Sequence, residues 1–294
     1  MYPLTLAAPS GLGPAQDGSQ DSRLVELWLA GKSSPHTRRA YAADAALFLR
    51  FIDKPLCRVT LADFEIWAAH LGQGSLKPAS RNRSLTAVKS LLSFAQQTGY
   101  LAFNVGAAVK LLPNRDSLAQ RILEESEVSR LIEAASWGRN RILLKLLYAT
   151  GARVSELCGL KWADAIARKE GGQLTLFGKG GRTRTILLKP AVWELLVSLR
   201  RDGHPQDPIF PSRKGGTPLD PSQVRRIVYA AARRAGLEQK VSPHWMRHAH
   251  ASHALDRKAP IHLVQATLGH ASVSTTGRYL HARPTESSGF YLPD

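Results

Sequence analysis

One interruption in the pattern of apolar residues divides this chain into two parts. Residues 104–121 are rich in Gly, Pro, Asn and charge, as in the run Pro113-Asn114-Arg115-Asp116, a composition that favours turns and linkers. Periodic apolar segments lie on both sides of this stretch. The sequence therefore predicts two domains joined by a linker, which agrees with the domain count that 294 residues favour. Extended, such a linker would span tens of ångströms.

Before the linker, residues 21–103 carry apolar side chains at helical spacing in four stretches with short connections. Tyr41, Phe48 and Ile52, for example, fall on one face of a helix. Four short-looped helices of this kind predict a small bundle. Residues 1–20 are rich in Pro, Gly, Ala and Ser and lack the charged start and apolar run of a signal peptide. We expect them to form a disordered leader.

After the linker, residues 122–294 mix two periodicities. Residues 173–177 and 184–188 alternate as strands do, and the glycine-rich run Gly178-Lys179-Gly180-Gly181-Arg182 separates them, which predicts a β-hairpin. The other apolar segments of this half have helical spacing. The predicted fold class is therefore α+β: mainly α, with a small β-hairpin or sheet in the C-terminal domain.

The charge of the chain points to a polyanionic partner. There are 40 Lys and Arg against 23 Asp and Glu, a formal net charge of +17, and the excess is spread over both halves. Such a balance favours nucleic acid, with an anionic membrane surface or no partner as the alternatives. No apolar run approaches the ~18 residues of a membrane span. Cys57 and Cys158 are too few and too far apart for a disulfide scaffold, so we expect a reducing cytoplasm.

Three motifs in the second half carry residues suited to chemistry. Arg153 lies in Ala149-Thr-Gly-Ala-Arg-Val-Ser-Glu-Leu157, directly after a glycine helix break. His244-Trp-Met-Arg-His248 puts His244, Arg247 and His248 within one helical turn. The third is Leu268-Gly-His-Ala-Ser-Val-Ser-Thr-Thr-Gly-Arg-Tyr279. Taken singly, each arginine is a candidate surface charge and the tyrosine a candidate packing residue.

The histidines of this region raise the question of a metal site. His248, His250 and His253 are closely spaced, but no Cys or carboxylate completes a zinc-like set with them, and the nearest acid is Asp256. We therefore expect no metal ion and no cofactor. We assign His250 no catalytic role and expect a buried or DNA-facing imidazole.

Taken together, the order and spacing of these motifs resemble the tyrosine recombinase (phage integrase) family. The Ala-Thr-Gly-x-Arg-x-Ser-Glu-Leu run and the Leu-Gly-His to Thr-Thr to Tyr run are highly specific, and the resemblance covers nearly the whole chain. It implies that residues 21–103 are a SAM-like helical core-binding domain of the Xer type. It further implies that residues 122–294 are the catalytic domain with a C-terminal tail, and that the two domains form a C-shaped clamp around DNA.

The family pattern maps residue by residue onto this sequence. The implied catalytic residues are Arg153, Lys179, His244, Arg247, His270 and Tyr279. Glu156 matches the acid that often follows the first arginine of the family. The arginines would neutralise the charge of the transition-state phosphate, and Tyr279 would attack the phosphorus to form a 3′-phosphotyrosyl bond. The resemblance makes His244 the candidate general base, Lys179 the candidate acid for the leaving 5′-oxygen, and His270 a hydrogen-bond donor to the phosphate.

The resemblance implies a site-specific DNA recombinase that needs neither metal nor ATP. Its role would be Xer-like, in chromosome or plasmid dimer resolution, or in integration and excision of a mobile element. Its partners would be double-stranded DNA and further copies of itself, as a tetramer on two DNA sites, with room for a second recombinase or accessory protein and with no membrane. We expect a cytoplasmic, nucleoid-associated protein. A type IB topoisomerase and a catalytically silent DNA-binding regulator on the same scaffold are the two alternatives.

Overall fold

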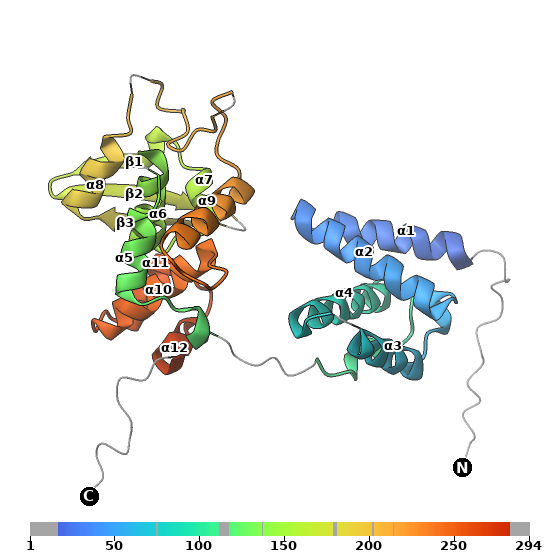
Figure 1. Ribbon diagram of the computed structural model, residues 1–294. Coiled ribbons are helices and arrows are strands. Elements are labelled where there is room, and N and C mark those ends of the chain that lie inside the picture. The colour runs from blue at the N-terminus through green and yellow to red at the C-terminus, as the bar shows by residue number, and fades with distance from the viewer. Residues whose placement is uncertain are drawn as a thin grey trace, which may run out of the picture. The chain divides into compact units, whose positions relative to one another are not determined.

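The structure is a computed structural model that describes residues 17–74, 76–111, 118–136, 138–178, 181–201, 203–213 and 215–282. The chain divides into two compact units, Met1–Arg115 and Asp116–Asp294 (Figure 1). Within the described residues both units are mainly helical, and the second also contains a three-stranded antiparallel sheet. The predicted fold class, mainly α with a small sheet in the C-terminal half, is therefore confirmed. Among the described helices, none has the length and apolar character needed to cross a membrane.

In its described part, the first unit is a bundle of four helices. They are α1 (Asp17–Ala30), α2 (Pro35–Ile52), α3 (Leu61–Gln73) and α4 (Pro78–Gln97), with two short 3₁₀ turns at Leu56–Arg58 and Val105–Ala107. Aromatic rings fill the centre: the Phe48 ring lies edge-on to Phe64 at 5.9 Å and to Trp67 at 5.7 Å between centroids. Because α1 begins at Asp17, the leader predicted through residue 20 is four residues too long at its C-terminal end.

Local sequence signals set the boundaries of these helices. The Ser34 hydroxyl accepts a hydrogen bond from the Thr37 backbone N–H at the start of α2. Thr60 and Asp63 form a reciprocal capping box at the start of α3. Such caps satisfy backbone N–H groups that have no partner within the helix.

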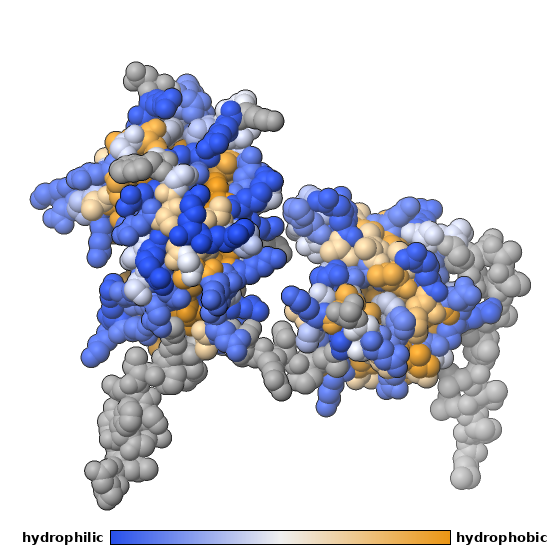
Figure 2. All heavy atoms as spheres, in the orientation of Figure 1, coloured by the Kyte–Doolittle hydropathy of each residue, from blue (hydrophilic) through white to orange (hydrophobic). Residues whose placement is uncertain are grey.

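The second unit combines eight helices with the sheet in its described part. The helices are α5 (Glu125–Glu133), α6 (Arg139–Thr150), α7 (Val154–Cys158), α8 (Pro190–Val197), α9 (Pro221–Arg234), α10 (Pro243–Asp256), α11 (Ile261–Leu268) and α12 (Val273–Ala282), with 3₁₀ turns at Ala119–Arg121 and Trp162–Asp164. Its main core gathers buried Leu, Ile and Val side chains from helices α5 to α10 and from the sheet. Figure 2 shows hydrophilic side chains over much of the visible surface of each unit.

The sheet has the order β1 (Ala165–Arg168), β2 (Gly171–Phe177), β3 (Thr183–Leu188). The predicted hairpin is β2–β3, with Leu174 opposite Ile186 on the buried side. The sequence did not predict β1, because three of its four residues are exposed and the strand has no apolar alternation. At the turn end of the hairpin, the Gly178 N–H donates to the Arg182 carbonyl at 2.7 Å.

Candidate active site

The turn between α6 and α7 places Arg153. Helix α6 ends at Gly151, whose backbone is left-handed (φ 57°, ψ 19°), a conformation that glycine adopts without strain. Arg153 then caps α7: its backbone N–H donates to Glu156 Oε2 at 2.7 Å and its Nη1 to Glu156 Oε1 at 3.0 Å. The Arg153 side chain is 36% exposed, so part of its guanidinium faces solvent and is available to a ligand.

Arg247 reaches the same turn from α10. Its side chain is buried, and its guanidinium donates to the Gly151 carbonyl at 2.6 Å and to the Leu268 carbonyl at 2.7 Å. Burial, followed by the charge of Arg153, lowers the pKa of Arg247 to about 10. Arg247 therefore remains a cation at neutral pH. It joins the end of α6 to the end of α11 through two backbone carbonyls.

A second salt bridge holds Glu156. Arg184, on β3, donates through Nη1 and Nη2 to both carboxylate oxygens, at 2.9 Å and 2.7 Å. Burial alone would raise the pKa of Glu156, but the hydrogen bonds from Arg184 and from the Arg153 backbone outweigh burial and lower this pKa below its usual value. Glu156 is therefore an anion with two guanidinium partners.

His270 follows α11 in the turn formed by Gly269, which is also left-handed (φ 65°, ψ 44°). Its Nδ1 shares a hydrogen bond of 2.9 Å with the hydroxyl of Thr276, a fully buried residue of α12. Burial, Arg247 and Arg153 together lower the pKa of His270 to about 4. The imidazole is thus neutral at pH 7 and lies beside Arg153, whose Nη2 donates to the Gly269 carbonyl at 3.4 Å.

Tyr279 lies on α12, enclosed by apolar side chains and only 6% exposed. Its ring is parallel to that of His270, at an interplanar angle of 4° and 6.3 Å between centroids. Its hydroxyl shares a hydrogen bond of 2.9 Å with Nδ1 of His248. Burial raises the pKa of Tyr279, although Arg247 and Arg278 act in the opposite direction. The phenol is therefore protonated at neutral pH and needs a proton acceptor before it can act as a nucleophile.

His248, like Arg184, is a residue of this site to which the sequence interpretation gave no role. Burial, followed by the nearby His244, lowers its pKa to about 4, so its ring is neutral. The His244 ring lies 6.5 Å from the His248 ring between centroids. The signal in the sequence was the spacing: His248 is four residues after His244, on the same face of α10.

The structure places the other predicted residues as follows. His244 is exposed on α10. Its pKa is nevertheless lowered, first because neighbouring atoms remove water from part of the ring and second because of the positive charge of Arg247. Lys179 lies outside the described residues, but Gly178 before it borders the site: a Cβ on Gly178 would be 3.3 Å from Glu156 Oε1. His250 is half-buried, and its Nδ1 lies 2.8 Å from the Tyr148 carbonyl.

Arg153, Arg184 and His270 line one open cleft of about 840 Å³. Its walls also include Gly178, Arg182 and Thr183 from the hairpin, and His262, Gln265, Ala266, Gly269 and Ala271 from α11 and the turn that follows. Three arginines in one cleft favour an anionic ligand such as a phosphate.

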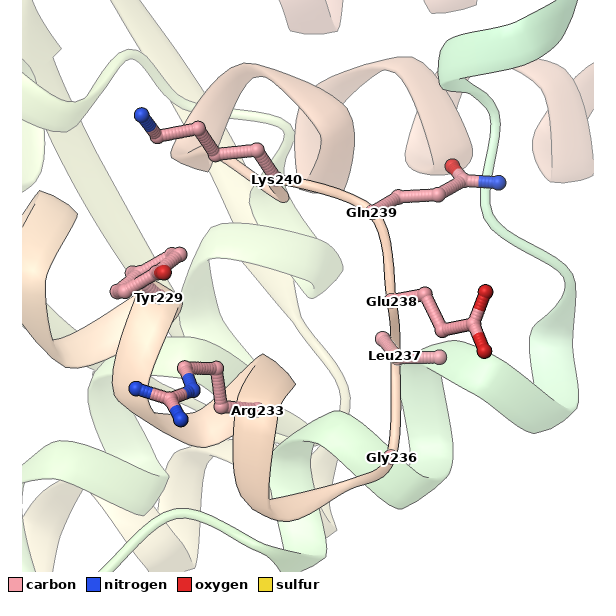
Figure 3. A pocket seen from close by; sticks show the side chains of 7 residues that line it. All are labelled: Tyr229, Arg233, Gly236, Leu237, Glu238, Gln239 and Lys240. Carbon is pink, nitrogen blue, oxygen red and sulfur yellow. The ribbon is translucent and has the colours of Figure 1, made fainter.

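A second hollow, of about 490 Å³, lies at the end of α9 and in the following loop, where Tyr229, Arg233, Leu237 and Lys240 line it (Figure 3). It contains none of the predicted catalytic residues. In the part of the chain that the structure describes, no group of three or more His, Cys, Asp or Glu side chains is placed to hold a metal ion.

Comparison with known proteins gives a consistent result for both units. Residues 121–286 match the phage integrase family, and residues 24–99 match the phage integrase N-terminal SAM-like domain. The tyrosine recombinase XerC of Xanthomonas campestris pv. campestris (strain B100) is 31% identical over 282 residues, which cover 92% of this chain and 86% of the relative. The tyrosine recombinase XerD of Shewanella oneidensis is 33% identical over 279 residues, which cover 89% and 91%.

A solved structure shares the fold at lower identity. The lambda integrase (75-356) dimer bound to a COC' core site superposes with a TM-score of 0.74 and 21% identity, and the superposition covers 92% of this chain and 97% of that chain.

Proposed function

The chain belongs to the phage integrase family of tyrosine recombinases, and from this premise we propose that it cuts and rejoins DNA through a phosphotyrosyl bond at Tyr279. Site-specific recombination of the Xer type is the activity that its relatives indicate. The observation that carries the proposal is the turn of residues 268–270. Arg153 and Arg247 both donate to carbonyls of this turn, and His270 within it lies parallel to the Tyr279 ring.

In the proposed cleavage step, the Tyr279 oxygen attacks the phosphorus of the scissile phosphodiester. A bond forms between phosphorus and the phenolic oxygen, and the bond to the 5′-oxygen breaks, which leaves a 3′-phosphotyrosyl ester and a free 5′-hydroxyl. Arg153 and Arg247 neutralise the charge that develops on the non-bridging oxygens. The ester conserves the energy of the broken bond, so a 5′-hydroxyl from the partner strand can reverse the step without ATP.

Proton transfer accompanies both bonds. We assign His244 as the base that accepts the phenol proton, Lys179 as the acid that protonates the leaving 5′-oxygen, and His270 as a hydrogen-bond donor to the phosphate. In the structure the Tyr279 hydroxyl shares a hydrogen bond with His248. This hydrogen bond must break before the hydroxyl can give its proton to His244.

The proposed partners are double-stranded DNA and further copies of the chain. The lambda integrase dimer on a core site supports two protomers for each site, and two sites would then bring four protomers together. Exposed arginines of α9 (Arg225, Arg226, Arg233 and Arg234) are suited to phosphate contacts that position the protein. The proposal also includes a second recombinase or accessory protein and a location on the nucleoid. The proposed biological role is either dimer resolution or mobile-element integration.

The decisive experiment detects the covalent intermediate. A duplex selected from a random-sequence pool by its binding to the full chain is nicked beside the cleavage position, so that religation fails and the adduct accumulates on a denaturing gel. Tyr279→Phe should abolish the adduct and keep the affinity for DNA. Tyr148→Phe, which removes a hydroxyl bonded to His253 outside the site, is the matched control and should retain the adduct.

Each alternative function has its own outcome in this experiment. An adduct that survives Tyr279→Phe would contradict the assignment of the nucleophile. Cleavage that EDTA abolishes and added metal restores would indicate a metallonuclease. Relaxation of supercoiled plasmid without a specific site would indicate a type IB topoisomerase, and a gel shift with no cleavage would indicate a DNA-binding regulator.

A further inference from the structure

Arg184 is the point at which three segments of the site are joined. It belongs to β3, beside the turn of the β2–β3 hairpin. Its Nη1 and Nη2 bind Glu156 at the start of α7, and its Nε donates to the Thr267 carbonyl at the end of α11 at 2.7 Å. The side chain is 13% exposed. We propose that Arg184 is a positioning residue for cleavage, which acts on the phosphate through Glu156 and Arg153; this inference rests on the proposed function.

Glu156 and the two arginines form one hydrogen-bonded group. Glu156 shares each carboxylate oxygen between the two arginines: Oε1 accepts from the Nη1 atoms of Arg153 and Arg184, and Oε2 accepts from the Arg153 backbone and from Arg184 Nη2. A bidentate guanidinium fixes the plane of a carboxylate, which a lysine cannot do. The orientation of Glu156, and through it that of the Arg153 side chain, therefore depends on Arg184.

Arg184 also affects the charge that Arg153 presents to the cleft. Glu156 carries one negative charge between two guanidiniums, and its side chain is only 2% exposed, so solvent screens it little. With Arg184 present, one arginine balances the carboxylate and the charge of Arg153 remains for a phosphate in the cleft. Without Arg184, the same carboxylate would pair with Arg153 alone and reduce its pull on the phosphate. Arg184 thus determines how much positive charge Arg153 can offer.

Arg184 also contacts the turn that carries His270. Thr267, whose carbonyl Arg184 holds, directly precedes Leu268 and Gly269, the acceptors of Arg247 and Arg153. A Cβ on Gly269 would lie 3.2 Å from Arg184 Nη1, so the guanidinium packs closely on this turn. One side chain therefore supports both arginines that we assign to the phosphate.

The test separates positioning of charge from structural support in general. Single-turnover cleavage at saturating full-length chain is measured on the nicked duplex and on the same duplex with a methylphosphonate at the scissile position, where a methyl group replaces one charged oxygen. Arg184→Lys and Arg184→Met are compared with Arg168→Met, which removes an arginine bonded to Gln173 in the same sheet but outside the cleft. Affinity for DNA is followed by gel shift, and folding by the melting temperature.

We expect Arg184→Lys and Arg184→Met to slow cleavage of the phosphate substrate by about 10- to 100-fold, the range expected when a catalytic group is misplaced. The affinity for DNA should change by less than about threefold, since this is a transition-state effect. On the methylphosphonate, the Arg184 variants should cleave less than about threefold more slowly than the unmodified chain. In an Arg153→Ala background, Arg184→Met should slow cleavage by less than about a further threefold. Arg168→Met should cleave at the normal rate.

Three results would overturn the inference. These are normal cleavage by both Arg184 variants, an equal deficit on both substrates, and a full additional loss in the Arg153→Ala background. If Arg184→Met fails to fold, Arg184→Lys with the two substrates decides the question. Absence of a Tyr279 adduct in the unmodified chain would instead contradict the proposed function, so the two failures are distinguishable.

Discussion

Gly151 gives a quantitative test of the packing behind the site. In Gly151→Ala, the new Cβ would lie 2.7 Å from His250 Cδ2 and 2.7 Å from Leu268 Cδ2, distances that require something to move. Neither neighbour can withdraw freely, because His250 is bonded to the Tyr148 carbonyl and Leu268 is fully buried. The backbone at this position is also left-handed, with φ +57°.

The expected magnitude follows from two separate costs. A left-handed conformation costs an L-residue about 1–2 kcal/mol, and the lower entropy of the unfolded alanine chain offsets about 0.4–1 kcal/mol of this. Overpacking of a filled core adds about 1–3 kcal/mol. Gly236→Ala is the matched control, because Gly236 has φ +72° in the same unit and nothing within 4 Å of its Cβ. The difference between the two variants isolates the overpacking.

Calorimetry of the full chain measures this difference. In a unit of this size each kcal/mol lowers the melting temperature by about 2–4 °C, so Gly151→Ala should melt about 2–12 °C below Gly236→Ala. Adduct formation should also slow in Gly151→Ala alone, because the Gly151 carbonyl accepts from Arg247. If the two variants melt within about 1 °C of each other, the packing between α6, α10 and α11 relaxes without cost and the reasoning is refuted.

Two further predictions concern stability at the site. Arg247→Met leaves two carbonyls without a donor, at about 1–3 kcal/mol each. Arg153→Met removes a guanidinium that is 36% exposed and leaves Glu156 paired with Arg184, so its cost should be about 1 kcal/mol or less. Both variants should lose cleavage, but urea unfolding should give a lower free energy of unfolding for Arg247→Met than for Arg153→Met. Equal free energies of unfolding would contradict the burial of Arg247. The pKa values of His248 and His270 are lowered to about 4, so the unfolded chain binds more protons between pH 6.5 and 4, and the free energy of unfolding should fall as pH falls through this window. Melting temperatures from pH 7 to pH 4 check this; His248→Gln should flatten the dependence, exposed His204→Gln should not, and a stability that rises toward pH 4 would contradict it.

Most of the secondary structure could be predicted from local patterns. The four helices of the first unit and the β2–β3 hairpin follow from apolar periodicity, glycine placement and caps, which are properties of short segments. Strand β1 was missed because an exposed edge strand needs no apolar alternation. The start of α1 was also placed too late, since its first residues, Asp17 to Gln20, carry no apolar side chain to mark a buried face.

The sequence also predicted only part of the candidate site. The motifs identified Arg153, Arg247, His270 and Tyr279, and the structure brings these four together around the turn of residues 268–270. Two contacts were beyond the sequence interpretation: His248 at the Tyr279 hydroxyl, and Arg184 on Glu156. The chain contains many histidines and arginines, and nothing in the sequence marks out His248 or Arg184. Only the hydrogen-bond partner of each residue in the structure distinguishes it.

The sequence alone was enough to predict the fold class and to give candidates for the reacting groups, because periodicity and motif spacing act within single elements. Only the tertiary structure decided which groups share hydrogen bonds across 31 residues, as His248 and Tyr279 do, or across 28, as Arg184 and Glu156 do. Such pairings depend on how α10 packs on α12 and how β3 approaches α7. The same packing sets the burial that lowers the pKa values of His248 and His270 and raises that of Tyr279, and no local pattern records that burial.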